Sequence, residues 1–184
     1  MKSIKILLII LIVSLKSIYN QEIFTGYYIE GEDTLDVFSY QLPANYTGNT
    51  PVPLLVAFHQ WGGNENSNYF TDFDEQADTL GWYFLSPYGG ASNNYNHQGA
   101  QKLFEGAILW MIDNYSIDKK RIYMVGGSMG GAAGAIYANN HLDPTKPMVA
   151  ATASASGILD CERRYYEMDG NNSMIEWFGG TPEE

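Results

Sequence analysis

The chain has 184 residues, which is room for one domain. Its hydrophobic share of 45% and aromatic share of 14% support a packed core and argue against an intrinsically disordered chain. The formal net charge is −11, and the sequence has no cluster of Lys and Arg of the kind that neutralises phosphates, so nucleic-acid binding is excluded.

The first 20 residues have the pattern of a secretory signal peptide. Lys2 and Lys5 precede an unbroken apolar run over residues 6–13, which is too short to span a bilayer. We expect cleavage near Asn20, no membrane anchor afterwards, and a single folded domain over residues 21–184. An uncleaved membrane anchor is the alternative interpretation.

Two further features bear on secretion. Three N-x-S/T sequons are candidates for glycosylation in a eukaryotic secretory pathway, at Asn45, Asn114 and Asn171. The single cysteine, Cys161, is unusual in a secreted protein and implies an intermolecular bond, a free thiol, or a partner outside this sequence.

The hydrophobic pattern predicts an alternation of strands and helices. Two short strands, over 24–29 and 35–42, are separated by a turn and form an antiparallel pair. Further strands are predicted over 54–58, 82–85, 121–125 and 148–155, and helices over 71–80, 103–112 and 130–139. The predicted buried stripes are Phe73, Ala77 and Leu80 in the first helix, and Leu103, Ala107, Trp110 and Met111 in the second. This order specifies an α/β fold with three layers, whose sheet is mostly parallel with antiparallel strands at the N-terminal side.

A G-x-S-x-G motif lies between the strand over 121–125 and the helix over 130–139. It reads Gly126-Gly127-Ser128-Met129-Gly130. A strand, a sharp turn and a helix are the context of a nucleophile elbow, in which Gly126 and Gly130 give the clearance that a strained serine needs. Ser128 precedes a helix N-terminus, so the Met129 N–H can donate to a developing oxyanion. A glycine-rich turn without chemistry is the alternative.

Several segments resemble a known family. They are Pro53–His59 with Gly62-Gly63, Gly81-Trp82 with Ser86–Gly89, and Ile117–Tyr123 leading into Gly127–Gly131. Together they resemble secreted esterases of the polyhydroxybutyrate depolymerase and feruloyl esterase type, within the α/β-hydrolase superfamily. Prolyl-oligopeptidase-like hydrolases share much of the elbow. The resemblance covers residues 54–157 and implies an α/β-hydrolase domain that cleaves esters through an acyl-enzyme on Ser128.

The same resemblance implies a second oxyanion donor. In α/β-hydrolases a glycine-rich turn after the third strand presents another backbone N–H, and here that turn is His59-Gln60-Trp61-Gly62-Gly63. The donor is Gln60 or Trp61, and we favour Trp61. His59 is expected to brace the loop by hydrogen bonds rather than to act as a base. An ordinary Gly-Gly turn is the alternative.

The rest of a catalytic triad does not follow the family pattern. The family order is Ser, then Asp or Glu, then His, but the only histidine after Ser128 is His141. We expect it to lie about 15 Å along the elbow helix, too far to act as a base. His97 precedes the elbow, and its reach stays open. Asp160 and Asp169 lie near where the sheet would continue, but no histidine follows either one.

The C-terminal segment suggests that the domain is incomplete. Residues 177–184 are similar to the segment that precedes the acid-bearing strand in related carboxylesterases, and Cys161 has no partner. We therefore expect a chain that stops within the domain.

Three functions remain open. The first is a secreted serine esterase acting on feruloyl, acetyl or polyester substrates, and the second is a prolyl-oligopeptidase-like peptidase on the same machinery. The third, from a different class, is a non-catalytic hydrolase-like module that binds a ligand without an acid and a base. A base from another polypeptide is a further possibility. No metal is expected because the three histidines lack ligand spacing, and no cofactor because Gly89-Gly90 is not a dinucleotide fingerprint.

Overall fold

A computed structural model describes residues 21–168 and 172–183. The predicted signal peptide, the candidate acid Asp169 and the sequon at Asn171 lie outside the described residues.

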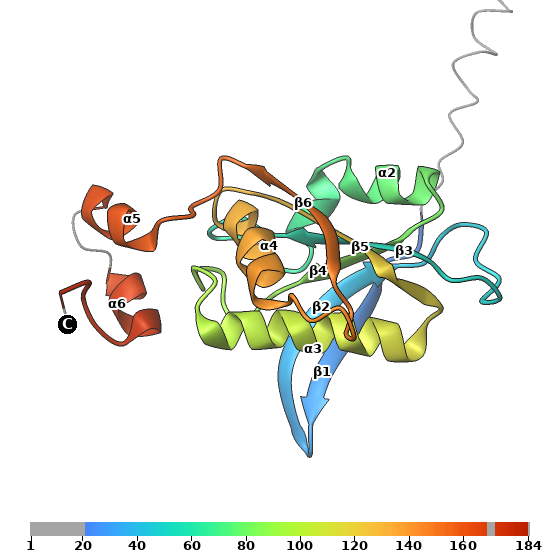
Figure 1. Cartoon of the computed structure of the whole chain (residues 1–184), viewed down its shortest axis with the longest axis horizontal. Coiled ribbons are helices and arrows are strands. Elements are labelled where there is room, and N and C mark those ends of the chain that lie inside the picture. Colours follow the sequence, from blue (N-terminus) through green and yellow to red (C-terminus); the bar gives the residue numbers. More distant parts are fainter. Residues whose placement is uncertain (1–20, 169–171, 184) are drawn as a thin grey trace, which may run out of the picture.

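A six-stranded mixed sheet forms the centre of the domain, in the order β1-β2-β4-β3-β5-β6 (Figure 1). Its strands are β1 Phe24–Glu30, β2 Asp33–Gln41, β3 Val52–Phe58, β4 Tyr83–Pro87, β5 Ile117–Gly127 and β6 Val149–Ala155. β1 pairs antiparallel with β2, and β2 pairs antiparallel with β4. All other pairings, from β4 to β6, are parallel. The predicted mostly parallel sheet with antiparallel N-terminal strands is confirmed.

Helices cover both faces of this sheet, which gives the predicted three layers. They are the 3₁₀ helix η1 Ser67–Phe70 and the α-helices α2 Phe73–Thr79, α3 Gln98–Asn114, α4 Met129–Asn140, α5 Cys161–Glu167 and α6 Asn172–Phe178. The helices α3 and α4 pack on one face and α2 on the other. Figure 1 shows α3 running along the sheet, with α5 and α6 set apart from the layers.

Alternation along β3 explains why its sequence is apolar throughout. Leu54, Val56 and Phe58 belong to the core under α3 and α4, whereas Leu55 and Ala57 belong to the cluster under α2. A central parallel strand is covered on both faces, so both sets of side chains are apolar. This packing fixes the end of β3, where the candidate oxyanion loop begins.

Two details of the helices differ from the sequence prediction. The helix α3 begins at Gln98, five residues early, because His97 caps it by accepting the Gly99 N–H at Nδ1 over 3.1 Å. Its buried face contains Phe104, Ala107, Ile108 and Met111. In the predicted stripe, Trp110 is half-buried but packs against the core, whereas Leu103 is half-buried and lies outside the core cluster, so the prediction was wrong in Leu103.

The predicted stripe of α2 was also wrong in one position. Ala77 is buried, but the side chain of Leu80 is 57% exposed. Leu80 is the C-cap residue and so lies beyond the last full turn, where the helical spacing no longer directs a side chain into the core.

The two short helices α5 and α6 were not predicted. They contribute Cys161, Tyr165 and Met174 to a small cluster around Tyr95 and Met129, so they pack against the residue that follows Ser128. In the described part of the chain, no helix combines the length and the apolar character needed to cross a bilayer.

Candidate active site

Ser128 stands alone between β5, which ends at Gly127, and α4, which begins at Met129. Its backbone has φ 52° and ψ −121°, a conformation that costs free energy in a residue with a Cβ. Three backbone hydrogen bonds hold it there. The Ser128 N–H donates to the Ala155 carbonyl over 2.9 Å, and the Ser128 carbonyl accepts from Gly131 over 3.1 Å and from Ile158 over 3.2 Å. The sharp turn that the motif predicts is therefore present.

The two elbow glycines permit a close approach of backbones. A Cβ on Gly126 would overlap the carbonyl of Gly130. A Cβ on Gly130 would overlap the carbonyl oxygen of Phe58 and lie 2.7 Å from that of His59. The first turn of α4 thus rests directly on the end of β3. Gly127, in contrast, has no such constraint, since its nearest neighbour would be 3.8 Å away.

This contact brings the two predicted oxyanion segments together. Met129 opens α4, so its N–H belongs to the first turn, where amides lack intrahelical acceptors. In the turn after β3, the Gly62 and Gly63 amides donate to Ser92 and Gln60. The amides of Gln60 and Trp61 donate to no acceptor within residues 21–168 and 172–183. Backbone N–H groups therefore remain available on both sides of the contact.

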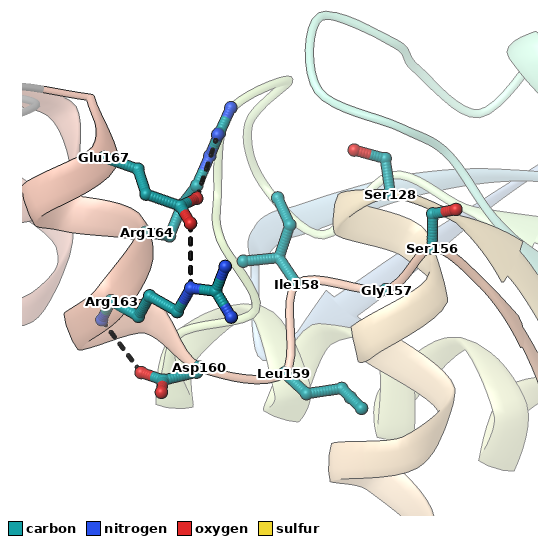
Figure 2. A pocket seen from close by; sticks show the side chains of 9 residues that line it. All are labelled: Ser128, Ser156, Gly157, Ile158, Leu159, Asp160, Arg163, Arg164 and Glu167. Atoms are coloured by element: carbon teal, nitrogen blue, oxygen red, sulfur yellow. Dashed lines mark hydrogen bonds and ion pairs between the residues drawn. The ribbon is translucent and has the colours of Figure 1, made fainter.

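A cavity of about 490 Å³ opens beside Ser128. Ser128 and the segment 156–159 line one side of this cavity, and charged side chains of α5 line the opposite side (Figure 2). The charged residues lining it are Asp160, Arg163, Arg164 and Glu167. A substrate held against Ser128 would therefore face a polar wall.

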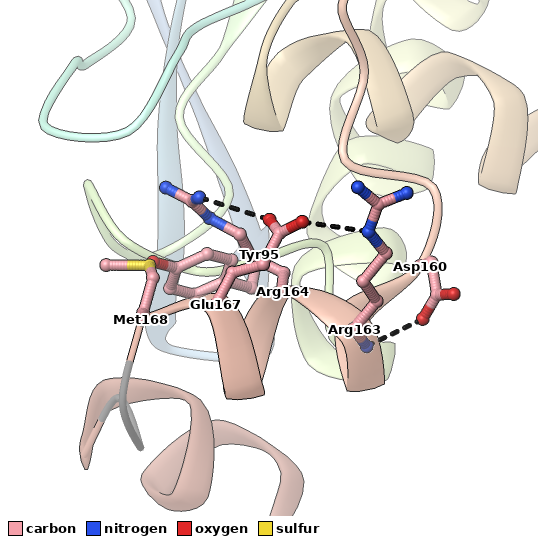
Figure 3. A network of polar contacts seen from close by, with 6 residues as sticks. All are labelled: Tyr95, Asp160, Arg163, Arg164, Glu167 and Met168. Carbon is pink, nitrogen blue, oxygen red and sulfur yellow. Dashed lines mark hydrogen bonds and ion pairs between the residues drawn. The ribbon is translucent and has the colours of Figure 1, made fainter.

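Ion pairs tie these charged residues together (Figure 3). Arg163 Nε donates to Glu167 over 2.8 Å, and Arg164 Nη1 lies 3.6 Å from the other oxygen of that carboxylate. The Asp160 side chain accepts from the Arg163 backbone N–H over 2.9 Å and so caps α5. All of these side chains are solvent-accessible, so the pairs contribute little to stability. Their effect is to make this wall of the cavity charged and polar.

His59 and His97 are both committed to structural contacts. His59 is buried, with Nδ1 2.9 Å from the Gln60 carbonyl and Nε2 2.7 Å from that of Tyr88, so it braces the loop. His97 caps α3, and its ring stacks on Trp177 at 4.7 Å. Burial lowers the pKa of His97, which favours its neutral form.

His141 lies at the far end of α4. It is the C-cap residue, its ring stacks on Tyr137 at 3.7 Å, and its Nδ1 lies 2.7 Å from the Tyr137 carbonyl. Twelve residues of α4 separate it from Ser128, about 18 Å of helix. Within the described residues, no histidine forms a hydrogen bond with Ser128, and Asp160 serves as a helix cap rather than as the partner of a histidine.

The remaining predicted residues lie away from the cavity or outside the described part. Asn45 and Asn114 are exposed, as a glycosylation site requires. Glycosylation at these two residues stays a prediction. Cys161 is half-buried, and burial raises the pKa of its thiol. No three His, Cys, Asp or Glu side chains gather as metal ligands in the described ranges.

The loop over residues 88–97 holds functional residues that the sequence patterns did not indicate. Asn94 and Asn96 are buried in it, and the Asn96 side-chain amide donates to the Met129 carbonyl over 2.8 Å. Asp36 of β2 is also buried and accepts the amides of Gly89 and Gly90, over 2.8 and 3.1 Å. Burial raises the pKa of Asp36, although these two amides oppose the shift. The available signal was the run of asparagines between residues 93 and 96.

No protein-family model matches the chain. Over 121 residues, it is 31% identical to a bifunctional acetylxylan esterase/xylanase, XynS20E, of Neocallimastix patriciarum. The matched part is 62% of this chain and 17% of that protein.

Solved structures of hydrolases share the fold. The fluorophosphonate-binding serine hydrolase FphF of Staphylococcus aureus superposes with a TM-score of 0.66 at 12% identity, over 83% of this chain and 63% of that one. An acetyl xylan esterase from Aspergillus awamori superposes with a TM-score of 0.58 at 18% identity, and the match covers 73% of this chain and 53% of the esterase. A ferulic acid esterase superposes with a TM-score of 0.61 at 18% identity, and the match covers 78% of this chain and 63% of that esterase. The chain thus has the α/β-hydrolase fold and spans between half and two thirds of these structures.

Gly130 offers a test of the elbow packing. We expect Gly130→Ala to lower the free energy of unfolding by about 3 kcal/mol or to prevent folding, because the new methyl group overlaps backbone that cannot move aside. Gly127→Ala is the matched control in the same motif and should change stability by less than about 1 kcal/mol. Urea denaturation followed by circular dichroism measures both. Equal stability of the two variants would contradict the close contact between α4 and β3.

Proposed function

We propose that this chain carries the nucleophile and the oxyanion hole of a serine esterase. One observation carries the proposal: Ser128 occupies a strained turn between β5 and α4, at the edge of a cavity and beside free backbone amides. Strained backbone of this kind is retained where it serves a function. The esterases among the similar structures support the same choice, as does the acetylxylan esterase named for the relative.

On this proposal, the reaction proceeds in two halves. The Ser128 hydroxyl attacks the ester carbonyl carbon and passes its proton to a general base, while the carbonyl oxygen becomes an oxyanion. The amides of Met129 and of Trp61 or Gln60 bind that oxyanion. The intermediate expels the alcohol, which takes the proton, and leaves an acyl group on Ser128. Water then attacks the acyl group through the same kind of intermediate, which releases the carboxylic acid and restores the Ser128 hydroxyl.

We assign no general base among the described residues, because none of the three histidines hydrogen-bonds to Ser128. His59, His97 and His141 each use ring nitrogens or ring faces in contacts away from Ser128. The nucleophile and the oxyanion donors are therefore the part of the machinery that we assign to this chain.

Replacing Ser128 tests the proposal. We expect Ser128→Ala to lower hydrolysis of p-nitrophenyl acetate by at least about a hundredfold, because no other hydroxyl lies in the elbow turn. Ser156→Ala is the matched control, since Ser156 lines the same cavity and should leave turnover within about twofold of the unmodified chain. The measurement is the initial rate of hydrolysis for the unmodified chain and both variants, each corrected for the rate in buffer alone. Turnover by Ser128→Ala equal to that of the unmodified chain would contradict the proposal.

A non-catalytic hydrolase-like module is the second candidate function. The commitment of all three histidines to other contacts favours it. It predicts that the unmodified chain is folded yet hydrolyses p-nitrophenyl acetate no faster than buffer does. Turnover of amide substrates in place of esters would instead favour the peptidase alternative.

The charged wall opposite Ser128 supports a small acyl group, of the acetyl type, over a long aliphatic or polyester chain. Extended apolar groups gain about 0.8 kcal/mol per buried CH₂, but only against apolar surface. Arg163 and Glu167 offer hydrogen-bonding groups instead, which suit the hydroxyls of a polar alcohol such as a sugar.

Acyl length provides the corresponding measurement. We expect kcat/KM for p-nitrophenyl acetate to exceed that for p-nitrophenyl octanoate by about tenfold or more, since the wall opposite Ser128 is charged and only Ile158 and Leu159 offer the longer chain apolar side chains in this cavity. A preference for octanoate would contradict the assignment of a short acyl group without affecting the role of Ser128. Arg163→Leu makes the wall less polar, so it should reduce the ratio of kcat/KM for acetate to kcat/KM for octanoate.

We also propose that the chain is secreted after removal of residues 1–20. Support comes from the apolar run behind Lys2 and Lys5, and from the position of the first described strand at Phe24, which leaves the sheet whole after cleavage. Expression in a eukaryotic host should give a protein in the medium whose N-terminal sequence begins near Gln21. Retention of Met1 in membrane fractions would favour the uncleaved anchor.

A further inference from the structure

We propose that Asn96 is a positioning residue that sets the oxyanion hole by holding Met129. This inference rests on the proposed function, because it concerns the same elbow. Asn96 is 6% exposed, and its side-chain amide donates to the Met129 carbonyl over 2.8 Å. It acts on the residue whose N–H is the assigned oxyanion donor, and not on substrate.

Met129 is held from the same loop at a second point. The Tyr95 N–H donates to the Met129 sulfur over 3.3 Å, and both Tyr95 and Met129 are almost fully buried. Met174 of α6 belongs to the same buried cluster as Tyr95 and Met129. A residue fixed at its carbonyl and its side chain has little freedom to turn, so the direction of its N–H is fixed as well. Donors held in advance in this way need no reorganisation when charge develops.

The backbone of the loop is strained to make this contact. Tyr95 has φ 45° and Asn96 has φ 61°, two consecutive residues in the left-handed region. Such a conformation is unfavourable for a residue with a Cβ and persists only where surrounding contacts hold it. Here Asn94 supplies them, since its side-chain amide reaches the Ala91 carbonyl over 3.0 Å and its side-chain oxygen accepts the Asn96 N–H over 2.9 Å. The strain directs the Asn96 side chain at Met129.

The same loop also holds the other half of the oxyanion hole. The Ser92 carbonyl accepts the Gly62 N–H over 2.7 Å, and the Tyr88 carbonyl lies 2.7 Å from His59 Nε2. Asp36 anchors the loop to β2 through the amides of Gly89 and Gly90. Residues 88–97 therefore bind the turn after β3 at one end and Met129 at the other. The loop acts as a clamp that fixes the two sets of donors relative to each other.

Asn96→Gly isolates the side chain from the backbone strain. Glycine adopts a positive φ without cost, so this variant removes the buried side chain and its hydrogen bond to Met129 without adding backbone strain. Asn93→Gly is the matched control, because Asn93 lies in the same loop and has no hydrogen bond to Met129. Asn96→Asp keeps the shape but puts a carboxylate oxygen against the Met129 carbonyl, so it should be the more damaging change.

The first measurement is steady-state hydrolysis of p-nitrophenyl acetate by the full chain. We expect Asn96→Gly to lower kcat about tenfold and to leave KM within about twofold, because a misplaced donor weakens binding of the transition state and not of the ester. Asn93→Gly should match the unmodified chain. Equal kcat for Asn96→Gly and Asn93→Gly, in a chain that hydrolyses ester, would overturn the inference and leave the proposed function standing.

The second measurement does not depend on activity. Amide hydrogen exchange of the segment 124–135 should be about tenfold faster in Asn96→Gly than in Asn93→Gly, because one buried hydrogen bond to the elbow is lost. If the unmodified chain hydrolyses nothing, the proposed function fails, and this comparison still decides whether Asn96 holds Met129. Equal exchange in the two variants would overturn the positioning role.

Discussion

The site depends on one close contact, between the first turn of α4 and the end of β3. Only a residue without a side chain can lie where Gly130 does, against the carbonyl oxygens of Phe58 and His59. This contact brings together two segments that are about 70 residues apart in the sequence. Without it, the amides after Phe58 and the amide of Met129 would have no reason to face a common point. The strained turn at Ser128 is a consequence of the same geometry, because the chain must leave β5 and enter α4 within one residue.

The contact alone would leave the donors loosely oriented, and the loop over residues 88–97 supplies the remaining order. Asparagine side chains replace regular secondary structure there, since Asn94 bonds to backbone groups within the loop and Asn96 bonds to the Met129 carbonyl at the start of α4. The loop begins at the end of β4, so the parallel sheet itself places it at the edge where β3 and β5 end. The fold thus sets the position of the site, and local hydrogen bonds set its precision.

The sequence was sufficient for the parts that depend on apolar periodicity and on glycine. The buried run of β3 and the motif around Ser128 could be recognised because each has a local pattern with one physical explanation. The start of α3 at Gln98 could not be recognised, because a capping histidine followed by Gln98 and Gly99 carries no apolar signal. The helices α5 and α6 were missed because Tyr165 and Met174 pack in a cluster with Tyr95 and Met129, which are distant from them in sequence. The role of Asn96 depends on a non-local hydrogen bond and is likewise invisible in a single sequence.

The central claim is that the Ser128 hydroxyl is an accessible nucleophile facing prearranged backbone amides. Its most direct test is the location of the adduct that a fluorophosphonate forms with the full chain, found by intact mass and peptide mapping. We expect one adduct per chain, on Ser128, and none on Ser156, which lines the same cavity and also has a positive φ. A folded chain that stays unmodified, or one that is modified at Ser156 instead, would contradict it.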